Sequence, residues 1–248
     1  MQTIKRAGIF LWATTLFLVS TPSLLFAQKS QPNDTNFVSY PVDLKRQDLK
    51  LYWKDDAGVN FKSILNLKQW LEKHKRHLLF AMNGGMYKAD QSPQGLFIEN
   101  QITKAGLDTS SGAGNFYLKP NGVFYITTGD IPFICNTVSF HNDGHVKYAT
   151  QSGPMLVIDG EIHPALKPGS PNLNIRNGVG VLPDNRVVFV ISKTAVNFYD
   201  FADYFKKLGC KNALYLDGFV SRAFLPEKQW FQTDGNFGVI IGVSTNAR

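Results

Sequence analysis

The sequence predicts an α+β protein: a single domain in which a mixed or antiparallel β-sheet core carries a few flanking helices. Short strand-like stretches follow one another closely between turns rich in glycine and proline. This succession favours antiparallel or mixed sheet over a regular β–α–β array. Two segments, 65–74 and 197–208, instead repeat apolar residues at helical spacing.

Strands are expected where apolar runs, or alternating apolar and polar residues, are bounded by turns. The segments that meet this description are 37–42, 49–53, 78–82, 95–99, 115–119, 123–127, 146–150, 155–158, 175–181, 187–191, 213–216 and 237–243. Residues 163–174 contain three prolines and are expected to form an irregular loop of the kind in which sites are common.

The two helices are expected to dock on sheets through one apolar face. Segment 65–74 has Lys and Glu between its apolar residues, as an amphipathic helix does. Segment 197–208 begins at Asn197, a good N-cap residue, and is followed by Gly209, a good C-cap signal. This second helix leads directly into the apolar strand 213–216.

The first residues have the pattern of a secretory signal peptide. Lys5 and Arg6 precede an uncharged stretch at 8–27, which ends at Ala27 before a polar run. A membrane anchor is the alternative, but Pro22 interrupts the stretch, so we expect cleavage, no stable membrane insertion, and a periplasmic or secreted protein. The expected organisation is a signal peptide at 1–27, a flexible leader at 28–35 and one domain at 36–248.

Composition and charge limit the possible partners. Hydrophobic residues make up 44% of the chain and charged residues 18%, as in ordinary globular proteins. Without residues 1–27 the chain keeps 24 basic against 19 acidic residues, a net charge of +5. The basic residues are scattered, so nucleic acid is a poor candidate. An anionic small substrate or a cell-surface polymer suits the charge, and so does a solvated face. The oligomeric state is left open.

The cysteines and histidines point to no metal or cofactor. Cys135 and Cys210 allow a disulfide in an exported protein, or are two buried thiols, and the sequence leaves this open. Neither has a nearby histidine, which argues against a thiol nucleophile. His141, His145 and His163 do not have metal-ligand spacing on one element. We expect no metal, although calcium in a loop is not ruled out by the sequence.

Glycines and polar residues follow the ends of three expected strands. They are Asn83, Gly84, Gly85, Ser152, Gly153, Asp217, Gly218, Ser221 and Arg222. Glycines after a buried strand permit unusual backbone angles and close approach of a ligand, or simply form a tight turn. A carboxylate at the mouth of a buried strand, as at Asp217, is a common site design, and an Asx-turn is the alternative.

Arg176 lies within the apolar segment 175–181. An isolated buried charge is costly, so its guanidinium needs a partner. That partner is expected to be either an internal carboxylate or an anionic ligand.

Four motifs in order resemble the phosphodiester glycosidase family over about residues 76–243. They are Asn83-Gly84-Gly85-Met86-Tyr87, Ser152-Gly153-Pro154 with Asp159-Gly160, Arg176 with Gly180, and Leu216-Asp217-Gly218 with Ser221. The resemblance implies a curved mixed sheet and an exported glycosidase that hydrolyses a sugar-1-phosphodiester at the glycosidic C–O bond. The chain departs from many members at Phe219 and Val220, where those have glycines, and these side chains would reshape the pocket.

The chemistry of this reaction assigns roles to the motif residues. Phosphate leaves as an anion, so stabilising its charge matters more than protonating it. Arg176 is expected on the phosphate, with Arg222 as second candidate, and Asp217 would activate water or face the anomeric carbon. Asn83 would orient a sugar hydroxyl. Further substrate contacts are expected from the corners, namely Gly84, Gly85, Ser152, Gly153, Gly218 and Ser221.

These roles require that Arg176, Asp217 and the glycine corners line one hollow. The alternative function is a non-catalytic envelope domain that binds a phosphate-bearing glycan through the same cleft. A peptidase or amidase is disfavoured because the sequence has no Cys/His, Ser/His or zinc pattern.

Overall fold

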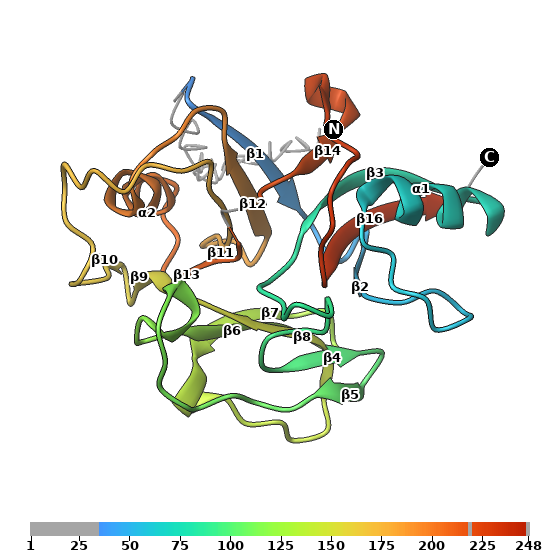
Figure 1. Ribbon diagram of the computed structural model, residues 1–248, viewed down its shortest axis with the longest axis horizontal. Coiled ribbons are helices and arrows are strands. Elements are labelled where there is room, and N and C mark those ends of the chain that lie inside the picture. Colours follow the sequence, from blue (N-terminus) through green and yellow to red (C-terminus); the bar gives the residue numbers. More distant parts are fainter. Residues whose placement is uncertain (1–34, 218–219, 247–248) are drawn as a thin grey trace, which may run out of the picture. The chain divides into compact units, whose positions relative to one another are not determined.

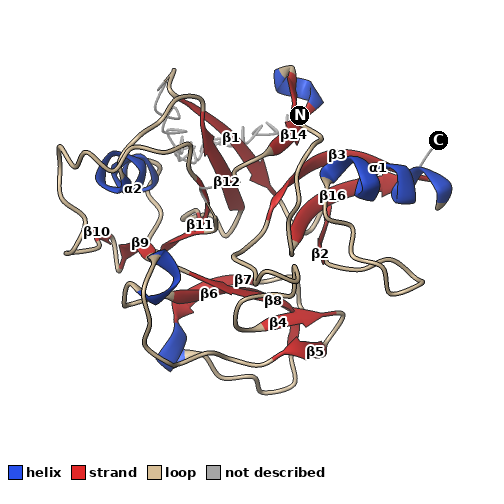
Figure 2. Ribbon diagram, in the orientation of Figure 1, coloured by secondary structure: helices blue, strands red, loops and turns tan. Residues whose placement is uncertain are grey.

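A computed structural model describes residues 35–217 and 220–246, which belong to one compact unit. The expected signal peptide and nearly all of the flexible leader lie outside the described residues, as do Gly218 and Phe219. Within the described ranges, no helix has the length and apolar character needed to span a bilayer. The predicted α+β class is confirmed: strands dominate, and two helices of ten residues accompany them (Figure 2).

The strands form three sheets, and every pair of neighbouring strands described in them is antiparallel. In order across the sheet, sheet 1 contains β1 (Phe37–Val42), β12 (Val187–Ser192), β11 (Asn177–Val181), β13 (Ala213–Tyr215), β9 (Met155–Ile158) and β10 (Glu161–Ile162). Sheet 2 contains β15 (Trp230–Phe231), β14 (Ala223–Leu225), β3 (Arg76–Asn83), β16 (Ile240–Asn246) and β2 (Asp48–Tyr52). Sheet 3 contains β5 (Ile102–Ala105), β4 (Phe97–Glu99), β8 (Val146–Ser152), β6 (Gly122–Thr127) and β7 (Pro132–Asn136).

One apolar core joins the three sheets. At its centre, the rings of Tyr40 and Phe80 stack with centroids 4.5 Å apart, and Phe80 stacks on Phe189 at 5.2 Å. Phe124 then meets Phe189 edge-on at 6.1 Å. These residues come from sheets 1, 2 and 3, so aromatic contacts across the core tie the sheets together.

Both helices lie where their patterns indicate (Figure 1). Helix α1 (Ile64–Lys73) buries an apolar face against sheet 2. Helix α2 (Phe198–Lys207) packs on sheet 1. The Asn197 side chain accepts a hydrogen bond from the amide of Asp200, which confirms it as the N-cap. Gly209 follows the helix with φ +85°, as a C-cap glycine does.

One expected strand is wrong. Residues 115–119 begin as a 3₁₀ turn, Asn115–Tyr117, in which the Tyr117 amide bonds the carbonyl of Gly114. The Asn121 side chain also donates to the Phe116 carbonyl, so local bonds replace a ladder. The strands β5, β7, β10, β14 and β15 were not expected from the sequence, and each has five residues or fewer.

Candidate functional site

Strands β3 and β13 end at one point where strand β11 begins, and polar groups at these three strand ends bond to one another. Asn83 closes β3, and its Nδ2 donates to the carbonyl of Asp217 at 3.0 Å. Asn177 opens β11, and its Nδ2 donates to Oδ1 and to the backbone oxygen of Asn83, both at 2.9 Å. The Oδ1 atom of Asn177 accepts from the amide of Asp217 at 2.9 Å. We call Asn83, Asn177 and Asp217 the strand-end network.

Two serines complete the frame around Asp217. The Ser221 hydroxyl donates to the Asp217 carbonyl at 2.9 Å, and the Ser152 hydroxyl donates to the carbonyl of Leu216 at 2.5 Å. Both serines are buried, as is Asn83. The sequence-predicted residues at the ends of β3, β8 and β13 therefore do converge. Their side chains bond to the backbone beside Asp217, which holds the strand end in one geometry.

The Asp217 carboxylate is close enough to Tyr87 for its charge to act on the phenol. Burial raises the pKa of Tyr87, and the negative charge of Asp217 raises it further. Because a raised pKa keeps the phenol protonated at neutral pH, Tyr87 presents a hydrogen-bond donor near this carboxylate. Asp217 itself is only half-buried.

The glycine corners are shaped by packing. A Cβ built on Gly84, Gly85 or Gly153 would fall 2.6–2.7 Å from a neighbouring side-chain atom, closer than real contacts allow. The Gly84 amide donates to the carbonyl of Val239 at 2.8 Å. It is thus committed inside the fold, which leaves Gly85 and Gly153 as candidate amide donors to a ligand.

Arg176 is fully enclosed, with a relative exposure of 0%. Its Nε donates to the Val196 carbonyl at 2.8 Å and its Nη2 to the Asn172 carbonyl at 2.7 Å. The guanidinium carbon lies 3.5 Å from the ring centroid of Phe198. Burial lowers the pKa of Arg176, and Tyr215 opposes that shift. The expected partner was a carboxylate or an anionic ligand, whereas the partners described here are carbonyl oxygens and aromatic rings.

The expectation that Arg176 and Asp217 line one hollow stays a prediction, and Nη1 of Arg176 is buried without a hydrogen-bond partner among the described residues. Its bonds go to the loop before β11 and to the approach to α2, and Asp217 is not among the groups that shift its pKa. Asn177, the next residue, bonds within the strand-end network instead. Adjacent residues in extended chain point to opposite faces, which fits the different partners of Arg176 and Asn177. This geometry favours a positioning role for Arg176.

Arg222 is also engaged. Its Nε contacts both carboxylate oxygens of Asp234 at 2.9 Å, and its side chain is 38% exposed. An anionic ligand would have to compete with Asp234 for this guanidinium. The second expected phosphate contact thus begins from an exposed ion pair, which is worth little and is readily exchanged.

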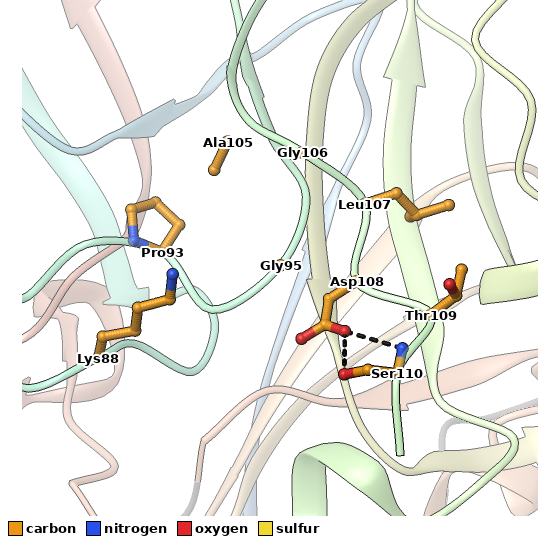
Figure 3. Close-up of a pocket in the computed structure, with 9 residues that line it drawn as sticks. All are labelled: Lys88, Pro93, Gly95, Ala105, Gly106, Leu107, Asp108, Thr109 and Ser110. Atoms are coloured by element: carbon orange, nitrogen blue, oxygen red, sulfur yellow. Dashed lines mark hydrogen bonds between the residues drawn. The ribbon is translucent and has the colours of Figure 1, made fainter. Parts of the chain in front are cut away.

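A cavity of about 370 Å³ lies next to the segment that carries Tyr87 (Figure 3). Its lining is Lys88, Pro93, Gly95, Ala105, Gly106, Leu107, Asp108, Thr109 and Ser110. Within it the Asp108 carboxylate accepts from the amide and the hydroxyl of Ser110, at 2.9 and 2.5 Å (Figure 3). Lys88 supplies the cation of this cavity.

Gln151 fixes the cavity to the strand-end network, and sequence reasoning missed it. Its Oε1 accepts from the amides of Leu96 and Asp108, and its Nε2 donates to the Asp108 carbonyl at 2.6 Å. Ser152 follows it in β8 and holds Leu216. The sequence signal for Gln151 was the polar pair that it forms with Ser152 at the end of β8. The signal for Asn177 was its position next to the buried Arg176.

The remaining titratable candidates are not arranged for catalysis. Cys135 and Cys210 are free thiols, and burial raises their pKa values to about 11 and about 12. Thiols with such pKa values are poor nucleophiles at neutral pH. In residues 35–217 and 220–246, no three His, Cys, Asp or Glu side chains gather as a metal site would require. The expectation that the protein uses no metal stays a prediction.

Comparison with known proteins places the chain in a family. The curated relative YigE of Escherichia coli K12, an uncharacterised protein, is 36% identical over 223 residues, which are 90% of this chain and 85% of YigE. A hypothetical protein from Synechocystis has the same fold with a TM-score of 0.54 at 12% identity, covering 84% of this chain and 59% of that one. Another similar structure is the catalytic domain of the zebrafish N-acetylglucosamine-1-phosphodiester α-N-acetylglucosaminidase, auto-inhibited by its pro-peptide. Its TM-score is 0.52 at 12% identity, and the match covers 84% of this chain and 88% of that domain. Residues 76–241 match the phosphodiester glycosidases, and the chain belongs to that family, as its motifs indicated.

Proposed function

We propose that the protein is an exported hydrolase that cleaves a sugar-1-phosphodiester at the glycosidic C–O bond. The observation that carries the proposal is the Asp217 carboxyl at the end of a buried strand whose backbone is fixed by Asn83 and Asn177. Glycoside cleavage requires a carboxylate held at the anomeric carbon, and a fixed backbone at Asp217 helps to place one. The family membership supports the same reaction class.

In the proposed reaction, water adds to the anomeric carbon and the bond from that carbon to the phosphate oxygen breaks. The bonding electrons leave with the phosphomonoester, and the free sugar keeps the oxygen of water. Asp217 accepts the proton of the attacking water and passes it to solvent or to the product phosphate. Tyr87 lies within the electrostatic reach of Asp217 and can donate a hydrogen bond there.

Charge on the departing phosphate needs donors, and the geometry supports a different set from that expected first. Lys88 offers an exposed ammonium at the cavity, and the amides of Gly85 and Gly153 are the corner donors. Arg222 could join them by leaving Asp234. Arg176 instead anchors the chain that places Asn177.

The decisive assay incubates the protein with an N-acetylglucosamine-1-phosphodiester, the substrate in the zebrafish enzyme's name, and measures free reducing sugar. The variant Asp217→Asn should lose about 10³-fold in turnover. Asp159→Asn is the matched control: that side chain is 75% exposed in a turn and should leave turnover unchanged. Full activity of Asp217→Asn would remove this carboxylate from the mechanism.

The alternative function has its own signature in this assay. A glycan-binding envelope domain would bind the phosphodiester without releasing sugar over long incubation. The proposed export rests on the expected signal peptide at 1–27, and determining the N-terminus of the mature protein tests it. Cleavage after Ala27 is the expected result.

A further inference from the structure

A second cavity, of about 290 Å³, lies away from Asp217 and beside helix α1. Strand β2 of sheet 2 contributes Tyr52, and strands β4 and β8 of sheet 3 contribute Glu99 and Tyr148. Trp70 of α1 and Asn100 also line this cavity. We call this the inter-sheet cavity. Its volume is close to the lower end of the range for small-molecule sites.

Two polar groups of the inter-sheet cavity have no hydrogen-bond partner among the described residues. The Tyr52 side chain is 6% exposed, and its hydroxyl is buried without a partner. Ser244 lies close enough to lower the Tyr52 pKa as a hydrogen-bond partner would, but the two hydroxyls do not meet hydrogen-bond geometry. The Glu99 carboxylate is half-buried and likewise makes no bond within the described chain. Buried polar groups are normally bonded, so the Tyr52 hydroxyl calls for a partner, while the half-buried Glu99 carboxylate is within reach of solvent or a ligand.

Several charged groups around the inter-sheet cavity pair with one another. Asp48 forms ion pairs with Arg76 and, at 3.2 Å, with Lys50. Asp56 accepts from the Trp70 indole at 3.0 Å and pairs with His74 at 3.0 Å. The cavity therefore offers a ligand a hydroxyl, a carboxylate and aromatic walls, with the Lys54 ammonium, which lies over the Trp53 ring, also in the lining.

We propose that the inter-sheet cavity binds a neutral sugar unit, through hydrogen bonds from its hydroxyls to Glu99 and Tyr52 and contact with aromatic walls. A carboxylate accepts from two neighbouring hydroxyls, and the phenol of Tyr52 both donates and accepts. An apolar body with a few placed polar groups is the usual design of such a site. An anionic ligand would meet the unpaired Glu99, and like charges repel in a partly buried site.

This inference goes beyond the proposed hydrolysis, because it concerns a site that the reaction does not use. The inter-sheet cavity would hold a second sugar of a polymer, or a free sugar, while chemistry occurs near Asp217. Its occupancy is independent of Asp217, so binding here should persist in Asp217→Asn. Failure of the hydrolysis assay would leave this prediction intact.

The test is an NMR titration of the ¹⁵N-labelled protein with glucose and with N-acetylglucosamine, following the Trp70 indole N–H. That group lies at the cavity and donates to Asp56. We expect a saturable shift with at least one of the two sugars and an affinity in the millimolar range, as for a small ligand with few contacts. Glucose-1-phosphate should bind more weakly than glucose.

Two variants and two controls make the test specific. Tyr52→Phe and Glu99→Gln should each weaken sugar binding by about tenfold, the effect of one lost hydrogen bond. Tyr125→Phe and Glu161→Gln, which lie outside the cavity, should bind as the parent does. The proposal is overturned by the absence of a saturable shift with both sugars, by unchanged binding in both cavity variants, or by tighter binding of glucose-1-phosphate.

Discussion

The strand-end network and the inter-sheet cavity are both built from buried polar side chains, but they treat these groups in opposite ways. In the network, the amide groups of Asn83 and Asn177 donate and accept within the fold. In the cavity, the Tyr52 hydroxyl is buried without a partner in hydrogen-bond geometry in the described chain, and the Glu99 carboxylate is half-buried. Polar groups that are fully hydrogen-bonded within the fold make it rigid, whereas groups without a partner can bind a ligand.

This difference separates positioning from binding. A network whose members bond one another costs stability when any member is removed, because its partners are then left buried and unpaired. A group without a partner can be deleted at little cost, or with a gain. Stability measurements on matched variants therefore test the contrast directly, without knowledge of any substrate.

The largest expected loss of stability follows Asn177→Leu. Four hydrogen bonds that hold Asn83, Asp217 and Leu216 run to this residue, three of them through its side chain. The substitution leaves the Asp217 amide and the Asn83 carbonyl oxygen unpaired, so unfolding in urea should show a loss of about 3 kcal/mol.

The exposed Asn142 serves as the control for that loss. Its side chain accepts a single local bond from the amide of Gly144. Asn142→Leu should change the free energy of unfolding by less than about 0.5 kcal/mol. Equal effects of the two substitutions would show that the network is not a source of stability.

Arg176→Lys should lower stability by about 2 kcal/mol, which distinguishes the positioning role from phosphate binding. Lysine cannot span the carbonyls of Val196 and Asn172 while lying flat on Phe198. Thermal unfolding reports the loss, and KM for an anionic substrate should change little. A raised KM with unchanged stability would return Arg176 to the phosphate.

How much the sequence could predict is clearest at residues 175–177. Apolar alternation located the strand, and the cost of burying charge showed that Arg176 needs a partner. It could not show that the partners are the carbonyls of Asn172 and Val196 and the ring of Phe198, because those contacts depend on tertiary packing. Asn177 was overlooked because its signal, the position next to the buried Arg176, did not show which way its side chain would bond.

The strand ends themselves were predictable, because glycines and polar residues directly follow apolar runs at Asn83, Ser152 and Asp217. Short and polar strands were not, as for β5, whose four residues are largely exposed. Burial in a sheet creates the period-two signal, and an exposed edge strand has little of it. The inter-sheet cavity, assembled from five separated segments, left no trace in local sequence.

Glu99→Gln should raise stability at neutral pH if the inter-sheet cavity is empty. Burial raises the pKa of Glu99, with Lys104 opposing the shift. A raised folded-state pKa contributes stability that is full below the unfolded value, near 4.5, and lost as pH rises through the folded value. The gain in stability from Glu99→Gln should therefore appear as the pH rises through the folded-state pKa of Glu99, and it should vanish below about pH 4.5.

Measurement of the unfolding midpoint of both proteins from pH 4 to 8 checks this dependence. Glu161→Gln is the control, because Glu161 is exposed and pairs with Lys206 at the surface. It should show little change over this range. A larger stability of the parent at pH 7 would mean that the Glu99 carboxylate has a favourable partner, contrary to the contrast with the network.

The smallest expected effect belongs to Tyr52→Phe. The substitution removes a hydroxyl whose pKa burial raises to about 12 and which has no hydrogen-bond partner in the described chain. The ring keeps its edge-on contact with Trp70, so packing is preserved. Stability should be unchanged or raised by up to about 1 kcal/mol, since an unsatisfied group is lost. A loss above about 1 kcal/mol in urea unfolding would show that the hydroxyl is bonded in the free protein, and the inter-sheet cavity would then resemble the network instead of a vacant sugar site.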